Sequence, residues 1–257
     1  MNIFSHLYDE DGTHYLEAKL PSIHSVELIN VLEKFAQYPK KLADSNDYYS
    51  TVMFDETYAQ ADGIIKRNTT FVDTPKDLIL SGPHFMVGNP LYKTPRNICT
   101  EKSHYDILDL SFVTNNYIPR TNYIPNCDDF EDKVPSIDFG DDFKKVTETY
   151  RLAFRGMFAQ PNERTLISAI IPKGITHINS VPCLSTNDND KLVYIASFTF
   201  SLVADYFVKA SARGGLYTSW KMYPQIENNI LLKTRTLSLS SLTSYYTELW
   251  EEQFNEE

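Results

Sequence analysis

The sequence predicts a mixed α+β fold of helices and short β-hairpins, and not a doubly wound parallel sheet. Three segments have the length and apolar spacing of helices, and short β-rich runs bounded by turn residues stand between the first and the later ones. Five prolines between positions 83 and 125 keep that part of the chain extended or looped. Strands and helices do not alternate regularly, so no βαβ series is indicated.

Two of the predicted helices rest on apolar residues alone. In residues 25–38, Leu28, Leu32 and Phe35 fall on one stripe of a helix. Residues 192–210 are mostly apolar, which predicts a buried helix, and the run is too short and too polar to span a bilayer. A further helix is expected near the carboxyl end, within residues 241–254.

The segment 141–158, DDFKKVTETYRLAFRGMF, is predicted to be an amphipathic helix. Its apolar residues recur at helical spacing, and they are Phe143, Val146, Tyr150, Ala153, Phe154 and Met157. Asp141 and Asp142 lie favourably at the positive end of the helix dipole. The polar residues are expected on the opposite, solvent-facing side, and they are Lys144, Glu148, Arg151 and Arg155.

The β-structure is predicted from short runs between turn residues. Residues 49–86 contain several such runs, among them DGIIKRNTTFVDTP. Within residues 82–126, the stretch YDILDLSFV (105–113) is expected to be ordered. Residues 164–181, RTLISAIIPKGITHINSV, predict a strand, a Pro-Lys-Gly turn and a second strand.

The formal net charge of -10 disfavours nucleic acid as a partner of the chain as a whole. The charge is unevenly distributed, however. Residues 144–237 carry 12 Lys and Arg against 6 Asp and Glu, whereas residues 124–143 carry 1 against 7. A bound polyanion would be met by this locally basic part, although charge blocks of this size also occur on ordinary solvated surfaces.

The cysteines and the amino-terminal residues indicate a cytoplasmic protein without a membrane partner. Cys99, Cys127 and Cys183 lie far apart without Cys-x-x-Cys spacing, which excludes a zinc ribbon and a disulfide scaffold and fits a reducing compartment. The first residues, MNIFSHLYDEDGTHY, lack a basic region followed by an apolar stretch, so no secretion signal is expected.

The tetrapeptide at 89–92, Asn-Pro-Leu-Tyr, is one residue away from Asn-Pro-Pro-Tyr, with which adenine-N6 methyltransferases hold the flipped base. It lacks the second proline, whose fixed φ helps to aim the asparagine amide. None of the nine glycines stands in the glycine-rich turn on which S-adenosylmethionine packs. Because Asn-Pro is a common turn element, we expect a turn here and not an active site.

Other catalytic patterns are missing too. Residues 131–133, Glu-Asp-Lys, have the Glu-x-Lys spacing of a metal-dependent nuclease, but they lie in an acidic stretch that reads as a loop. The six histidines do not have the spacing of metal ligands, and no serine lies in a Gly-x-Ser-x-Gly turn. We therefore expect a binding module that is not catalytic and holds no cofactor and no metal of its own.

Five segments, in this order, resemble the carboxy-terminal target-recognition region of Eco57I-type (type IIG-like) restriction-modification adenine-specific DNA methyltransferases. The segments are ILSGPHFMVGNPLYKTPR (79–96), YIPRTNYIP (117–125), the run from Tyr150 to Val181, FSLVADYFVKAS with MYP (200–224), and LKTRTLSLSSLTSYYTELWEE (232–252). In this family the first segment lies downstream of the catalytic motifs, which agrees with a turn at Asn89. The methyltransferase half of the family is absent, so the resemblance implies either an excised domain or a stand-alone remnant.

The resemblance implies a DNA sequence-recognition domain whose partners are double-stranded DNA and an upstream methyltransferase domain in the parent protein. S-adenosylmethionine, with Mg as a second candidate, is expected for the parent enzyme and not for this chain. The expected division is an amino-terminal helical segment (1–44), a recognition domain (45–237) and a carboxy-terminal helix (238–257). A rival interpretation is a protein–protein interaction subunit of a phage-defence or restriction complex, which the acidic flanks and the 17 tyrosines would suit.

The candidate DNA contacts fall into two groups. Phosphate contacts need cations and small polar groups, and we expect them from Lys93, Thr94, Arg96, Lys144, Arg151 and Arg155. Base reading needs side chains that reach a groove, and we expect it from Arg120, Asn122, His177 and Asn179. Residues 119–123 are alternatively a structural turn in which Thr121 and Asn122 cap the backbone. Arg164 is expected to pair with Glu163 or with a core carboxylate.

Overall fold

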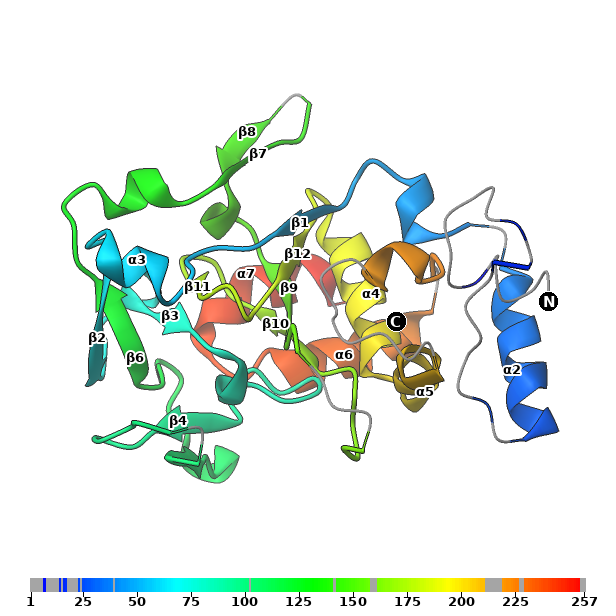
Figure 1. The fold of residues 1–257 in the computed structure, drawn as a ribbon, viewed down its shortest axis with the longest axis horizontal. Helices are drawn as coiled ribbons and strands as arrows, with labels where there is room; N and C mark the ends of the chain where they lie inside the picture. Colours follow the sequence, from blue (N-terminus) through cyan, green and yellow to red (C-terminus); the bar gives the residue numbers. More distant parts are fainter. Residues whose placement is uncertain are drawn as a thin grey trace.

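The computed structural model describes most of the chain, and Figure 1 shows how its elements are arranged. The described residues are 7, 14, 16–17, 23, 25–38, 40–101, 103–140, 142–157, 161–210, 219–226 and 229–254. The fold is mixed α+β, as predicted. A small antiparallel sheet has helices on one side and a β-rich part on the other.

A four-stranded antiparallel sheet forms the centre of the molecule. In spatial order its strands are β1 (Tyr49–Thr51), β12 (Cys183–Ser185), β9 (Arg151–Phe154) and β10 (Ser168–Ile171). Side chains along a strand point alternately to the two faces of a sheet. Leu152 and Phe154 therefore pack into the helical core, whereas Ala153 packs into the β-rich core. Both faces are buried, which explains why β9 and β10 are largely apolar.

Helices lie on one side of this sheet. They are α2 (Val26–Ala36), α4 (Asn189–Phe200), α5 (Leu202–Ala210), α6 (Ile230–Ser240) and α7 (Thr247–Gln253). α4 is the central helix, which contacts β9 and β10 directly, and all of its residues from 192 to 199 are buried. α2 packs against it through Phe35, whose ring centroid lies 6.1 Å from that of Phe198 and 4.8 Å from that of Phe207 in α5. The helix predicted within residues 25–38 is confirmed.

The helix predicted over residues 192–210 is in fact two helices, which meet at Ser201 with a bend of 71°. Ser201 has an extended backbone, with φ -74° and ψ 152°, and its Oγ accepts a hydrogen bond from Ala204 N at 3.0 Å. The same residue thus ends α4 and caps α5. Within the described ranges, no single helix is long and apolar enough to cross a membrane, and this bent pair reaches that length and apolarity only when its halves are counted together.

The β-rich part is built from two-stranded ribbons. The antiparallel pairs are β2 (Ile65–Thr70) with β6 (Thr121–Pro125), β4 (Lys93–Pro95) with β5 (Tyr105–Ile107), and β7 (Ser136–Asp138) with β8 (Phe143–Lys145). A parallel pair is formed by β3 (Ile79–Leu80) and β11 (Thr176–His177). Figure 1 shows β2 at the outer edge of the molecule, with β6 on its inner side. The β-runs expected within residues 49–86 are thus present.

Short helical turns connect these ribbons. They are α3 (Tyr58–Ala61) and the 3₁₀ turns η1 (Leu42–Asp44), η2 (Pro75–Asp77), η3 (Gly82–His84), η4 (Leu110–Phe112), η5 (Phe130–Lys133), η6 (Val146–Glu148), η7 (Ser219–Met222) and η8 (Ser244–Tyr246). The stretch 105–113, expected to be ordered, contains β5 and η4.

The prediction of a helix at 141–158 is wrong. Residues 143–154 form β8, η6 and β9 instead. The apolar spacing suits a helix, but β9 pairs with both β12 and β10, and its apolar side chains are buried on both faces of the sheet. Thr149, just before β9, is β-branched and has an extended backbone, with φ -108° and ψ 153°. Strand pairing with distant residues therefore decides the structure of this segment.

The strands predicted within residues 164–181 exist, but they do not form a hairpin with each other. β10 pairs with β9, whereas β11 pairs with β3. Gly174 in the turn between them has φ 90°, a backbone conformation that residues with a side chain rarely adopt. A Cβ atom there would lie 3.2 Å from Pro75 Cβ. The turn is therefore packed against η2, which orients β11 toward β3.

The carboxy-terminal helix is present as α7, and it follows η8 directly. α6 was not predicted, because the apolar residues of ILLKTRTLSLS do not form one stripe. α6 crosses position 237, where a domain boundary was expected, and Leu32 and Leu42 from the predicted segment 1–44 share one core with Leu152. The division into three parts remains a prediction.

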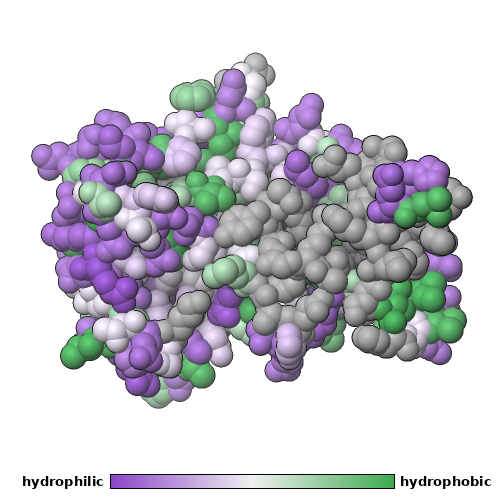
Figure 2. Space-filling view, viewed as in Figure 1, coloured by the Kyte–Doolittle hydropathy of each residue, from purple (hydrophilic) through white to green (hydrophobic). Residues whose placement is uncertain are grey.

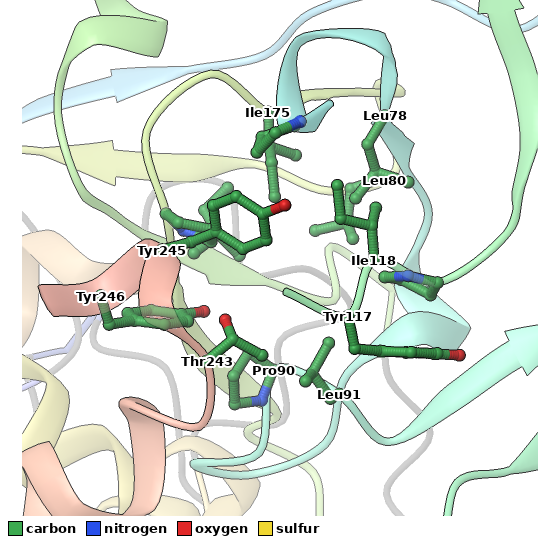
Figure 3. A pocket seen from close by; sticks show the side chains of 14 residues that line it. Leu78, Leu80, Pro90, Leu91, Tyr117, Ile118, Ile175, Thr243, Tyr245 and Tyr246 are labelled. Atoms are coloured by element: carbon green, nitrogen blue, oxygen red, sulfur yellow. The ribbon is translucent and has the colours of Figure 1, made fainter. Parts of the chain in front are cut away.

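A small apolar cavity of about 30 Å³ marks the seam between the carboxy-terminal segment and the β-rich part (Figure 3). Tyr245 and Tyr246 face it from one side, and Leu80 and Ile118 from the other. Tyr246 Oη donates a hydrogen bond to Ile170 O at 2.9 Å, which fixes the seam to the central sheet. The cavity has room for about one water molecule, so it is a packing feature and not a ligand site.

Candidate nucleic-acid interface

A groove of about 520 Å³ opens in the β-rich part beside the β2–β6 and β4–β5 ribbons. Its charged lining residues are three cations and two acids, namely Arg67, Lys93, Arg155, Glu56 and Glu101. Figure 2 shows that hydrophilic residues gather over this end of the molecule, where β2, β6 and α3 lie. Of the ten predicted DNA contacts, Lys93, Asn122 and Arg155 line the groove.

Arg67 on β2 is exposed at the groove, and its guanidinium is held by two contacts. Nη1 donates to Tyr123 Oη at 3.4 Å, and Nη2 donates to the carbonyl oxygen of Cys99. The Tyr123 hydroxyl in turn donates a hydrogen bond to Glu56 Oε1 at 2.6 Å. Burial, followed by the hydrogen bond to Glu56, raises the pKa of Tyr123, so the hydroxyl stays protonated and keeps this direction of donation.

The groove floor contains Asn122, whose side chain is tied up inside the protein. Asn122 Nδ2 donates to Tyr105 Oη at 2.7 Å, and its Oδ1 accepts from Thr69 Oγ1 at 3.0 Å. Burial raises the pKa of Tyr105 to about 12, so this hydroxyl also remains neutral. With 6% of its surface exposed, Asn122 supports the floor. Its predicted role in base reading does not fit this position.

A buried histidine links the groove floor to Arg120, which directly precedes β6. His84 Nε2 faces the carbonyl oxygen of Arg120 at 2.8 Å and therefore donates to it. In the neutral imidazole Nδ1 is then the acceptor, and it lies 3.1 Å from Ser81 N. Burial lowers the pKa of His84, which keeps the ring neutral. These hydrogen bonds connect η3 rigidly to the start of β6 below the groove.

Arg155 lines the groove, but it is not on a solvent-facing helix as predicted. Its Nε donates to Gly82 O at 2.7 Å, and its Nη2 donates to Phe85 O. Burial lowers the pKa of this guanidinium. Arg155 therefore anchors η3 and adds positive charge to the groove wall.

The predicted phosphate contacts Lys93 and Thr94 lie on β4, and they differ in exposure. Lys93 is half-buried at the groove, with its Nζ 4.9 Å from the centroid of the Tyr92 ring. Thr94 is 8% exposed, and its Oγ1 accepts a hydrogen bond from Arg120 N at 3.0 Å. Lys93 is thus placed for an electrostatic contact, whereas Thr94 joins β4 to the start of β6.

Arg96 and Arg120 lie at the ends of these two strands. Arg96 Nε pairs with Asp106 Oδ1 at 2.8 Å across the β4–β5 ribbon, and the Arg96 side chain is 54% exposed. Arg120 Nη1 donates to Pro95 O at 3.3 Å, and its guanidinium stacks 4.1 Å from the ring centroid of Phe71. Phe71 is itself 53% exposed, so the stacked pair forms a surface feature, although neither residue lines the groove.

Arg151 and His177 are fully buried, which corrects two of the predicted contacts. Arg151 points from β9 into the β-rich core and donates from Nη2 to Ile175 O. Burial, and then the charge of Arg151, lowers the pKa of His177 to about 3. Burial likewise raises the pKa of Cys183 to about 12. These side chains are enclosed by the core and are not at the groove.

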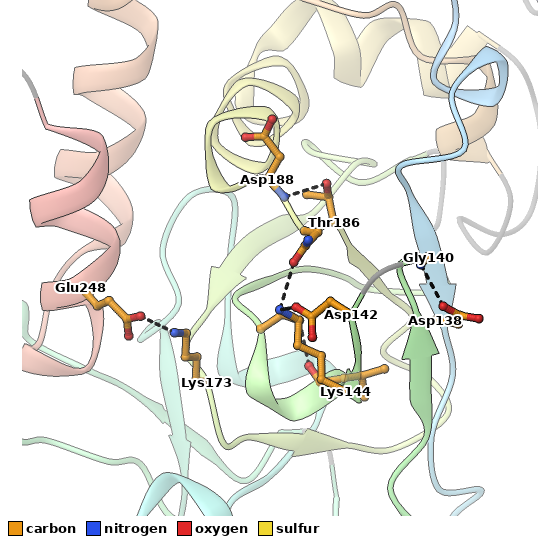
Figure 4. A network of polar contacts seen from close by, with 11 residues as sticks. Asp138, Gly140, Asp142, Lys144, Lys173, Thr186, Asp188 and Glu248 are labelled. Carbon is orange, nitrogen blue, oxygen red and sulfur yellow. Dashed lines mark hydrogen bonds and ion pairs between the residues drawn. The ribbon is translucent and has the colours of Figure 1, made fainter.

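Lys144 and Asn179 are engaged with side chains of their own surroundings. Lys144 Nζ lies 2.6 Å from Asp142 Oδ2 and 2.9 Å from Asn187 Oδ1, on the β7–β8 ribbon away from the groove lining (Figure 4). Asn179 Nδ2 donates to Asp55 Oδ2 at 2.6 Å. Asn179 follows the groove residue Ile178 and therefore borders the groove, whereas Lys144 does not.

The structure also brings forward residues that the sequence reasoning missed. Lys66, Arg67 and Asn68 are exposed one after another on β2. Three consecutive polar residues inside a β-rich run, IKRNTT, are the sequence signal that would have identified them. Among the described residues β2 has β6 as its one strand neighbour, and an outer strand of this kind exposes more than one face.

Two structural interpretations made from the sequence agree with the contacts. Asn89 Oδ1 accepts a hydrogen bond from Leu91 N at 2.9 Å, so the Asn-Pro pair forms a turn on its own backbone. Arg164 pairs with the core carboxylate of Asp205, with Nε 3.6 Å from Oδ1. The structural alternative for residues 119–123 is met only in part: Thr121 Oγ1 donates to the backbone oxygen of Ile79 at 2.8 Å, but Thr121 and Asn122 begin strand β6 and not a turn. The Asn122 side chain bonds to other side chains and not to the backbone.

The described residues hold no group of three or more His, Cys, Asp or Glu side chains placed to bind a metal ion. The tripeptide 131–133 lies in η5, where Lys133 pairs with Asp129 at 2.8 Å. Comparison of the chain with protein-family models and with curated proteins finds no match.

Proposed function

We propose that this chain is the DNA sequence-recognition domain of a restriction-modification, type IIG-like adenine-N6 DNA methyltransferase. The observation that carries the proposal is the outer strand β2, on which Lys66, Arg67 and Asn68 are all exposed and Arg67 lines a groove that contains further cations. A two-stranded β-ribbon fits the major groove of B-DNA, which is about 12 Å wide. The family resemblance over residues 79–252 supports the same function.

Positioning and reading are separate tasks in such a complex, because phosphate contacts fix the register while base edges carry the sequence. Lys66 and Lys93 are flexible point charges suited to phosphates. Arg120, stacked on the exposed ring of Phe71, is the predicted base reader whose position fits this role. Arg96 remains a phosphate candidate at the edge of the same surface.

In this proposal the chain itself is not catalytic. Methyl transfer requires a pocket for the flipped base, and the asparagine of 89–92 is folded onto its own turn. S-adenosylmethionine, and Mg as a second candidate, would be held by the methyltransferase part of the parent protein. That part is also the expected protein partner, and a cytoplasmic location belongs to the same proposal.

Binding to a fluorescent mixed-sequence duplex tests the proposal. The chain is expected to bind at low salt. The logarithm of the association constant should then fall linearly with the logarithm of the salt concentration. Lys66→Ala and Lys93→Ala should each reduce the magnitude of the slope of this line by about 0.9, because each removes one phosphate contact. Fluorescence anisotropy measures both the affinity and the salt dependence.

The matched control is Lys34→Ala, which removes an exposed lysine from α2 at the opposite end of the molecule (Figure 1). This variant has the same change in net charge and should leave the salt dependence unchanged. If Lys34→Ala and Lys93→Ala weaken binding equally, the groove is not the DNA-binding surface. Absence of binding to any duplex at low salt would contradict the proposal itself.

A second candidate function, docking onto another protein, is favoured by α6. This helix exposes three consecutive apolar residues, Ile230, Leu231 and Leu232, and also Leu239, which is 54% exposed. Exposed apolar patches of this kind mark protein contacts. DNA binding that requires addition of the purified methyltransferase partner would favour this candidate, whereas binding by the chain alone favours DNA recognition.

A further inference from the structure

We infer that Arg67 is the residue that reads a guanine in the DNA major groove, with Tyr123 and the carbonyl of Cys99 as its positioning groups. This inference rests on the proposed function, and it assigns base reading to a residue that the sequence reasoning did not select. Its basis is the place of Arg67 on the outer strand, the way its guanidinium is held, and the charge beside it.

Arg67 stands in the middle of the outermost strand, opposite Tyr123 of β6 in the antiparallel register. Its side chain shares the groove face with Tyr123, whereas Lys66 and Asn68 precede and follow it on the other face. The pairing shifts between Arg67 and Thr70, and such an irregularity bends a strand and increases its twist. The ribbon therefore presents Arg67 toward the groove while Lys66 and Asn68 flank it.

The guanidinium is held before any DNA arrives. Nη1 donates to Tyr123 Oη, Nη2 donates to the Cys99 carbonyl, and the guanidinium carbon lies 5.8 Å from the Tyr123 ring centroid. A guanidinium has five N–H donors, so three remain for a ligand. Because the side chain is already ordered, binding loses less conformational entropy than it would for a free arginine.

The acid next to Arg67 favours a base over a phosphate. Glu56 accepts a hydrogen bond from the Tyr123 hydroxyl, which itself accepts one from the Arg67 guanidinium. The carboxylate is therefore held close to Arg67, with the tyrosine hydroxyl between them. A negative phosphate approaching this point is repelled by the carboxylate, whereas a neutral base edge is not. The O6 and N7 acceptors of guanine match the planar arginine fork, which a lysine cannot reproduce.

Selection of bound duplexes from a library with a randomised centre tests the inference on the full chain. The wild-type chain is expected to enrich a motif that contains a guanine at one fixed position. Arg67→Lys keeps the positive charge but loses the fork, and it should lower the preference for guanine at that position by roughly tenfold or more. The other positions of the motif should stay unchanged.

Two further variants separate positioning from charge. Tyr123→Phe removes the hydroxyl that holds Arg67, so it should reduce the same guanine preference partly while the salt dependence of binding stays the same. Lys93→Ala should keep the whole motif and reduce the salt dependence by about 0.9. Thermal melting of each variant checks that the fold is intact.

The outcomes are distinguishable. A motif that Arg67→Lys retains with its guanine overturns the inference and leaves the proposed function standing. A loss of affinity in Arg67→Lys that is equal for all sequences makes Arg67 a phosphate contact and also overturns it. If the wild-type chain binds DNA and enriches no motif, both the inference and the recognition function fail.

Discussion

The buried carboxylate of Asp205 in α5 holds the segment before β10, and Asp205→Ala is expected to lower the free energy of unfolding by about 3–5 kcal/mol. Asp205 Oδ1 accepts hydrogen bonds from Thr165 N at 2.7 Å and Leu166 N at 2.6 Å. It also lies 3.6 Å from Arg164 Nε, and the Asp205 side chain is 7% exposed. One carboxylate thus satisfies two backbone donors and one cation.

The magnitude follows from these contacts. A hydrogen bond to a charged group contributes about 1.5–3 kcal/mol, and truncation to alanine leaves both N–H groups buried without a partner. Arg164 would also lose its counter-charge, although its Nη2 still donates to Phe200 O and Ser201 O at 3.2 Å. These two carbonyls keep the cost near 3–5 kcal/mol, the range for breaking a buried ion pair.

Urea unfolding followed by intrinsic fluorescence measures this cost. Asp205→Asn keeps one acceptor oxygen and loses the charge, so its loss should be about half as large. The control is Asp47→Ala, which breaks an exposed pair with Lys191 and should cost at most about 1 kcal/mol. A loss for Asp205→Ala no larger than that of Asp47→Ala would refute the reasoning.

Three further results are expected. His177 has a pKa of about 3 in the folded protein because of burial and Arg151, against 6.5 when unfolded, so the unfolded state takes up a proton first as the pH falls. Stability should drop by up to about 1.4 kcal/mol per pH unit from pH 6.5 toward 3, and His177→Gln should flatten this slope in urea unfolding at pH 4–6. Gly174→Ala should cost about 1–2 kcal/mol and lower the melting temperature more than Gly140→Ala, because both glycines have positive φ but a new Cβ meets a neighbour only at Gly174. Incubation with labelled S-adenosylmethionine and mixed-sequence DNA should transfer no label above a no-protein control, and transfer would contradict a non-catalytic chain.

Local patterns in the sequence predicted the elements whose structure depends on residues close in the chain. The stripe of Leu32 and Phe35 predicted α2, and the Asn-Pro turn at Asn89 followed from turn chemistry alone. The apolar run after residue 192 predicted a helix but not its interruption at Ser201. The interruption comes from the extended backbone of this serine, which the apolar pattern does not reveal.

The segment 143–154 shows where local patterns fail. Its apolar spacing suits a helix, whereas pairing with β10 and β12, which lie far along the chain, makes it a strand. That error moved Arg151 and Arg155 from the core and the groove wall to a supposed solvent-facing side. The exposure of Arg67 was equally hidden, because it depends on β2 having β6 as its one strand partner among the described residues.

The outer position of β2 also bears on self-association of the protein. An edge strand offers unpaired N–H and C=O groups to the edge of another molecule, which leads to self-association. Lys66 and Arg67 place like charges along this edge, and the shift in pairing before Thr70 breaks its regularity. Because like charges repel, we expect these two cations to keep the edges of neighbouring copies apart. Neutralising both of them would make the chain prone to aggregate, even though neither side chain supports the core.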